Sequence, residues 1–176
     1  MRAHRWITAA LVVALLGGCG ESGGEESPGA AAAAGGTWTD IGGTCPALTG
    51  EGKGVFDASL EIDTPTLYTA TCTYGDELTA SYLIGKDEGD EPPAEAANTE
   101  KTEAQLRGQP AADLTGVGEG GVIYADGGKL HAITWSGNAT VTALVPAGAV
   151  TSENQLSAHT ADLTAVLKDL LTGLQK

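Results

Sequence analysis

Apolar and polar residues alternate in two neighbouring stretches in the middle of the chain. Residues 67–74 and 77–84 follow this pattern on either side of Gly75-Asp76. A period of two residues is typical of strands that bury one face, and a short Gly-Asp connection favours a tight turn. We therefore expect a β-hairpin here. Residues 55–62 are a further candidate strand, whose start is left open by the glycines at positions 50, 52 and 54.

The same alternation returns three times between residues 121 and 145. The stretches are 121–125, 129–136 and 139–145, and they are separated by Asp126-Gly127-Gly128 and by Gly137-Asn138. Glycine and asparagine tolerate the positive φ angles that tight hairpin turns require. The sequence therefore predicts a three-stranded antiparallel meander.

Helical spacing appears at the end of the chain. Residues 152–155 (SENQ) match a capping box, and leucines follow at positions 156, 163, 167, 170 and 174. Apolar residues three, four and seven apart line one face of a helix, so we expect a C-terminal amphipathic helix. A second helix is expected over residues 94–107, between Pro92-Pro93 and Pro110. Because its only large aliphatic residue is Leu106, this helix should lie on the surface and pack thinly.

These elements together predict an α+β fold, in which a hairpin and a meander form an antiparallel sheet that the surface helix and the C-terminal helix cover. The chain has 176 residues, which is room for one domain. Its first residues able to pack in a core are Trp38 and Ile41, so we place a single domain at residues 37–176.

The beginning of the chain has the pattern of a bacterial lipoprotein signal. Arg2, His4 and Arg5 are followed by an apolar run over residues 6–16, which is too short to span a bilayer, and then by Leu16-Gly17-Gly18-Cys19. Small residues directly before a cysteine are typical of a lipobox. We expect residues 1–18 to be a signal peptide and Cys19 to carry the lipid that anchors the protein in the membrane. A plain signal peptide with a coincidental cysteine is the alternative.

Residues 19–36 are expected to be the lipidated cysteine and a flexible linker. Residues 20–36 hold no aromatic or β-branched residue and three glutamates, so they cannot bury enough apolar surface to offset the entropy of ordering. The net charge of the whole chain is -14. The expected signal peptide contains two of the nine basic residues and no acidic one, so the mature charge would be -16. This balance excludes nucleic acid as a partner and would hold the domain away from anionic lipid.

Three cysteines are present in the chain. Assigning Cys19 to lipid leaves Cys45 and Cys72, an even pair that would form a disulfide in an oxidising compartment. Two free thiols or a two-cysteine metal site remain as alternatives.

Several short motifs also resemble a known family. They are the lipobox with its low-complexity linker, residues 45–49 (CPALT), 70–74 (ATCTY) and 114–120 (LTGVGEG), the meander and the C-terminal helix. This set resembles small actinobacterial lipoproteins grouped as a domain of unknown function. The resemblance implies a disulfide between Cys45 and Cys72 and a helix after the first of them, from which Gly50, Gly52 and Gly54 depart. A more distant likeness to extracellular sensor domains of bacterial Ser/Thr kinases implies binding without catalysis.

Chemistry-bearing motifs are few. The expected mature chain has two histidines, His131 on a predicted strand and His159 on the closing helix, and each is more simply a surface or edge residue than a catalytic base. The acidic stretch 86–91 lacks the spacing of a calcium loop, so we interpret it as a solvated connection. We expect no cofactor and no enzymatic activity.

The sequence is best interpreted as a noncatalytic binding or sensory module on the outer face of the cell membrane. Its partner would be a cell-wall component, a small ligand or an envelope protein. The glycine-rich loop before the meander and two nearby aromatic residues suggest a candidate ligand surface, made of Gly118, Glu119, Tyr124 and Trp135. The alternatives are an enzyme accessory or a hydrolase with an unrecognised site, and a structural lipoprotein.

Overall fold

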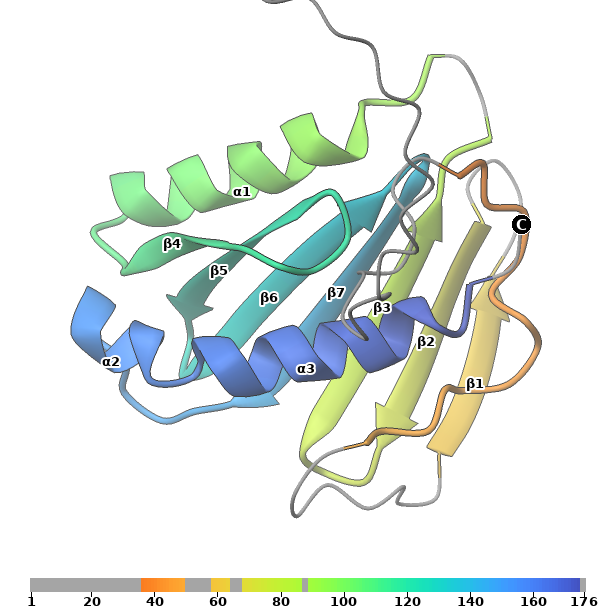
Figure 1. Cartoon of the computed structure of the whole chain (residues 1–176). Coiled ribbons are helices and arrows are strands. Elements are labelled where there is room, and N and C mark those ends of the chain that lie inside the picture. The colour runs from red at the N-terminus through yellow and green to blue at the C-terminus, as the bar shows by residue number, and fades with distance from the viewer. Residues whose placement is uncertain (1–35, 50–57, 64–67, 87–88, 175–176) are drawn as a thin grey trace, which may run out of the picture.

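The computed structural model describes residues 36–49, 58–63, 68–86 and 89–174. Within these residues, seven strands form one antiparallel sheet with the order β1-β2-β3-β7-β6-β5-β4, and three helices lie on its faces (Figure 1). The predicted α+β class is therefore confirmed. In chain order the elements are β1 (Ala58–Asp63), β2 (Tyr68–Tyr74), β3 (Leu78–Ile84), α1 (Pro93–Leu106), β4 (Ala111–Leu114), β5 (Gly120–Asp126), β6 (Lys129–Ser136), β7 (Ala139–Pro146), α2 (Glu153–Ser157) and α3 (Thr160–Leu171).

The predicted hairpin and meander are both present. Strands β2 and β3 pair around Gly75, and β5, β6 and β7 pair in sequence. Gly127 and Gly128 connect β5 to β6 with φ angles of 55° and 77°, which residues other than glycine rarely adopt. The candidate strand over 55–62 appears as β1, which begins at Ala58 and pairs with β2 at the edge of the sheet.

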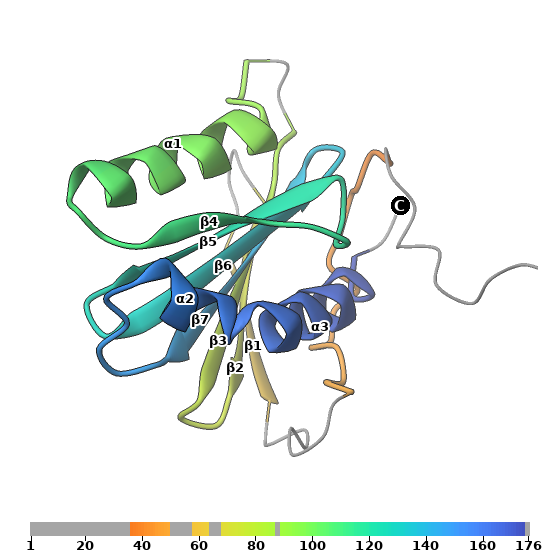
Figure 2. The same cartoon turned by 60° about the vertical axis from the view of Figure 1, so that its left-hand side comes forward.

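The main core lies between the sheet and helices α2 and α3. Figure 2 shows the sheet with these two helices on one side and α1 on the other. Side chains that alternate along the strands reach this core, as the pattern of the sequence requires. Its largest fully buried side chains are Tyr74, Tyr82, Ile41, Ile84, Leu114, Ile123, Leu130, Leu156, Leu167, Leu170 and Val117.

Helix α1 packs on the opposite face through small residues. Ala97 and Ala104 are buried against Val122 and Ile133, whereas Leu106 is 83% exposed. Alanines give a helix little apolar area to bury, and the main contacts of α1 are with β4, β5 and β6. The same face of β2 and β3 is therefore open.

Two details differ from the sequence-based expectations. The prediction of a single C-terminal helix was wrong, because the segment is divided into α2 and α3. They are separated by a turn in which the His159 amide donates to the Leu156 carbonyl (3.1 Å). This turn lets α2 contact β4 and β5 while α3 lies on β6 and β7. The short edge strand β4 was also not predicted, because its sequence AADL has neither β-branched residues nor clear alternation.

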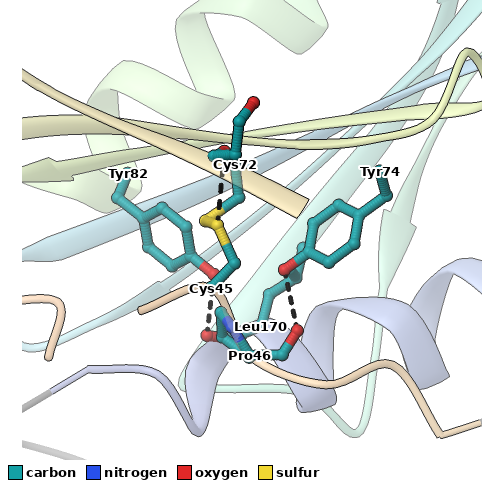
Figure 3. The surroundings of a disulfide bond; sticks show 7 residues. Cys45, Pro46, Cys72, Tyr74, Tyr82 and Leu170 are labelled. Carbon is teal, nitrogen blue, oxygen red and sulfur yellow. Dashed lines mark hydrogen bonds between the residues drawn. A yellow bond between two sulfur atoms is a disulfide. The ribbon is translucent and has the colours of Figure 1, made fainter. Parts of the chain in front are cut away.

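The segment 36–49 is fastened to the domain at several points. Cys45 and Cys72 form a disulfide with a Cα–Cα distance of 5.7 Å, so the predicted pairing is confirmed. In Figure 3 Tyr74 and Tyr82 lie on either side of this bond, and the Tyr74 hydroxyl donates to the Pro46 carbonyl (2.9 Å). Burial, with the Asp169 charge adding to it, raises the pKa of Tyr74 to about 12, so its hydroxyl remains a donor at physiological pH.

Two further contacts extend this attachment. The Thr49 hydroxyl donates to the Asp169 carboxylate at the end of α3 (2.7 Å). At the other end of the segment, the Trp38 indole donates to the Ser136 carbonyl (2.7 Å), and its amide donates to the Asn138 side chain (2.7 Å). No helix follows Cys45 over residues 46–49, and residues 50–57 lie outside the described residues.

Candidate functional site

The open half of the sheet carries an array of hydroxyl groups. Alternate residues of β2, β3 and β7 point to the face on which α1 lies, and most of them are threonine or serine. The register places Thr71 beside Ser81 and Ser81 beside Thr142. In the next row Leu83 separates Thr69 from Thr140. Antiparallel pairing thus brings together five hydroxyl side chains, which are Thr69, Thr71, Ser81, Thr140 and Thr142.

These side chains form the floor of a groove whose wall is α1. One hollow of about 330 Å³ lies over all five hydroxyl residues and under Ala96, Ala97 and Glu100. A second, of about 300 Å³, lies at the start of α1 and is lined by Asp90, Glu91, Pro92 and Pro93 together with Gly85 and Asn138. Because Leu83, Ala96 and Thr140 line both hollows, we treat them as one groove, called here the α1 groove.

A hydrogen-bonded cluster fixes the wall of the α1 groove. The Tyr124 hydroxyl donates to Glu100 Oε2 and lies 3.1 Å from His131 Nδ1. The Tyr124 and His131 rings stack with their centroids 4.6 Å apart. These contacts join α1 to β5 and β6 and hold the Glu100 carboxylate at one position above the hydroxyl floor.

The surroundings of this cluster set its protonation. Burial raises the pKa of the Tyr124 hydroxyl, and its hydrogen bond to Glu100 raises the pKa further, so the phenol remains protonated. Burial lowers the pKa of His131, although the charges of Asp126 and Glu100 act in the opposite direction. A neutral imidazole and a protonated phenol are therefore expected near neutral pH. Since the phenol O–H donates to Glu100, His131 can donate to the phenol oxygen in the tautomer that carries its hydrogen on Nδ1.

The charge of the α1 groove has one sign. Among the described residues that line the two hollows, the charged side chains are Asp90 and Glu91 at one end and Glu100 at the other. Lys101 is ion-paired with Asp113 (2.5 Å). The Lys86 amide donates to the Asp90 carboxylate (3.1 Å), and the Lys86 ammonium lies over the Tyr68 ring. A groove with carboxylates and hydroxyls favours ligands that are neutral or positively charged.

The four residues of the predicted ligand surface lie in two places. Gly118, Glu119 and Trp135 are together, because the Glu119 amide donates to the Trp135 carbonyl (2.9 Å) and a Cβ on Gly118 would come within 2.3 Å of that oxygen. Tyr124 lies further along β5, at about 13 Å from Gly120 by strand geometry. Trp135 is the register partner of Thr140, which lines the α1 groove.

The sequence therefore indicated two residues that border the α1 groove, Trp135 and Tyr124, but not the hydroxyl residues of its floor. The alternating threonines at 69, 71, 140 and 142 were visible in the sequence. Only strand pairing shows that they are neighbours, because β2 and β7 are separated by β3 and by more than 60 residues of chain. Cys19, the expected site of lipidation, lies outside the described residues, so its lipidation stays a prediction.

Over the described residues, no group of three or more His, Cys, Asp and Glu side chains is placed to hold a metal ion. The helices of this part of the chain include none that is long and apolar enough to cross a membrane. Comparisons with protein-family models, with curated proteins and with solved structures found no match.

Proposed function

We propose that this protein is a lipid-anchored binding module of the extracytoplasmic face of the cell membrane, and that it holds its ligand in the α1 groove without chemical turnover. The observation that supports this most is the groove itself, where a carboxylate fixed by Tyr124 stands over five hydroxyl side chains. Such groups form hydrogen bonds with a ligand and orient it.

The proposed location depends on the beginning of the chain. Leu16-Gly17-Gly18-Cys19 is the expected acylation signal, and two acyl chains suffice for stable anchoring. The Cys45–Cys72 disulfide supports an oxidising compartment, where such bonds persist. A linker of the composition of residues 20–36 has a root-mean-square reach of about 23 Å, so the domain would stand clear of the lipid headgroups.

The segment 36–49, which follows the expected linker, lies close to the α1 groove at its beginning. The Trp38 backbone exchanges hydrogen bonds with the Asn138 side chain, which also donates to the Gly85 carbonyl (2.6 Å). Asn138 and Gly85 both line the α1 groove. The segment 36–49 is therefore attached beside one end of the groove at Trp38, and it is secured again at Cys45.

Mass spectrometry of the membrane fraction tests the anchor. The mature protein should begin with a diacylated Cys19, and Cys19→Ala should move the protein out of the membrane fraction. A product that begins at another residue and does not sediment with membranes would contradict the proposal.

Binding to the α1 groove is tested with a panel of cell-wall fragments, envelope polysaccharides and synthetic peptides. Thr142→Trp would fill the larger hollow, whereas Thr115→Trp places the same side chain at an exposed position of the β4–β5 loop and serves as the control. The proposal requires a ligand that the control binds and the groove variant does not. Steady turnover of any member of the panel, abolished by Thr142→Trp, would show a catalytic groove and refute the noncatalytic part of the proposal.

A further inference from the structure

The chemistry of the α1 groove indicates the class of its ligand. We infer that the groove binds an extended basic polypeptide segment, whose backbone lies over the hydroxyl floor and whose Lys or Arg side chains reach Glu100 at one end and Asp90 and Glu91 at the other. This inference rests on the proposed function and adds the identity of the ligand.

The floor matches the repeat of a peptide backbone. Hydroxyl side chains at positions i and i+2 of a strand, such as Thr69 and Thr71 or Thr140 and Thr142, are about 6.7 Å apart. An extended peptide repeats over the same distance, because its alternate N–H and C=O groups point to the same side. Serine and threonine both donate and accept hydrogen bonds, so one row of them satisfies N–H and C=O groups alike. The floor therefore fits an extended chain that runs parallel to the strands.

The walls supply the preference for positive charge. Glu100 cannot turn away from the groove without losing the hydrogen bond from Tyr124, so its carboxylate is positioned in advance. Glu91 is exposed at the opposite end of the groove, where the second hollow opens. Among the described residues that line the two hollows there is no Lys, Arg or His, and the chain as a whole has a net charge of -14. Charge of one sign around a cleft raises the local concentration of ligands of the other sign.

The same charges argue against two other occupants. The expected linker contains Glu21, Glu25 and Glu26 and no basic residue, so the groove would repel it. A second copy of this acidic chain would be repelled as well. Phosphate-bearing polymers would place like charges beside Glu100 and Asp90, which is unfavourable.

The inference is tested with the full chain purified from membranes in an uncharged detergent. Three capped peptides of equal length serve as probes, with repeats of Lys-Thr, Gln-Thr and Glu-Thr, and binding is measured by calorimetry at 50 mM and 300 mM salt. The Lys-Thr peptide should bind, more weakly at higher salt, while the Glu-Thr peptide should show no binding.

Matched variants identify the groups responsible. Glu100→Gln should weaken binding of the Lys-Thr peptide by about threefold, the effect of losing one exposed ion pair. Glu153→Gln makes the same change at an exposed position of α2, which lies on the other face of the sheet, and should leave the affinity unchanged. Tyr124→Phe removes the phenol but keeps the Glu100 carboxylate, so it separates the loss of charge from the loss of positioning. Binding that survives Tyr124→Phe but decreases in Glu100→Gln supports a direct charge contact.

Two results would overturn the inference in different ways. Equal affinity for the Lys-Thr and Gln-Thr peptides, unchanged by Glu100→Gln, would show that charge has no part, and the proposed function would then stand with a neutral ligand. Binding of the Lys-Thr peptide that is insensitive to Thr142→Trp would place the contact outside the groove and refute both proposals.

Discussion

Removal of the Cys45–Cys72 disulfide is the perturbation whose effect on stability the structure specifies best. The bond closes a loop of 28 residues, counting both cysteines. Cross-linking a loop of this size reduces the entropy of the unfolded chain and stabilises the native state by about 3.5 kcal/mol. The unfolding entropy of a domain of roughly 140 residues is about 0.3 kcal/mol/K, so the melting temperature should fall by about 12 °C.

The double variant Cys45→Ala, Cys72→Ala and reduction of the natural protein address two parts of this effect. Reduction breaks the cross-link but leaves both sulfur atoms in place. The double variant in addition leaves space at Cys72, which is fully buried, and should melt slightly lower than the reduced protein. Both are compared by circular dichroism melts at one pH and one protein concentration.

Loss of the disulfide should not by itself unfold the segment around residue 45. The Tyr74–Pro46 and Thr49–Asp169 hydrogen bonds remain, and Pro46 stays packed so tightly on Gly173 that a Cβ there would lie 2.3 Å from Pro46 Cγ. Hydrogen exchange should therefore show a modest local increase at Leu48 and Thr49. A melting temperature that falls by less than about 3 °C after complete reduction would refute the argument from loop entropy.

Three other predictions concern single positions. Gly118→Ala should lower the free energy of unfolding, measured in urea, by more than about 2 kcal/mol, because a Cβ would meet the Trp135 carbonyl oxygen. Gly116 also has a positive φ but has open space around it, so Gly116→Ala should lower the same free energy by about 1 kcal/mol. Burial lowers the pKa of His131, so as the pH falls the unfolded chain binds a proton at a higher pH than the folded protein does. The free energy of unfolding should therefore decline below pH 6.5, and His131→Gln should reduce this decline in unfolding titrations. Ala104→Leu should destabilise the protein by about 1–3 kcal/mol because it separates α1 from the sheet, while Leu106→Ala should change stability by less than about 0.5 kcal/mol in the same assay. Equal costs within either matched pair, or a pH dependence that His131→Gln leaves intact, would contradict these assignments.

The sequence by itself determined most of the local structure. Alternation around Gly75 and around Gly127-Gly128 predicted the hairpin and the meander, because side chains of a strand point alternately to its two faces and the turns need residues that accept positive φ. Ser152 was predicted as a helix cap, and its hydroxyl accepts a hydrogen bond from the Gln155 amide (3.3 Å). The Cys45–Cys72 pairing followed from counting cysteines.

Tertiary structure decided what local patterns do not contain. The turn at His159 arises because the closing segment must follow two parts of a twisted sheet, and β4 forms because β5 offers it an edge. The α1 groove depends on three facts of packing, namely the strand order, the register that aligns Thr71 with Ser81, and the alanine contacts that hold α1 on β5 and β6. A row of hydroxyl groups from strands far apart in the chain exists only after these strands have paired, so no periodic pattern in the sequence predicts it.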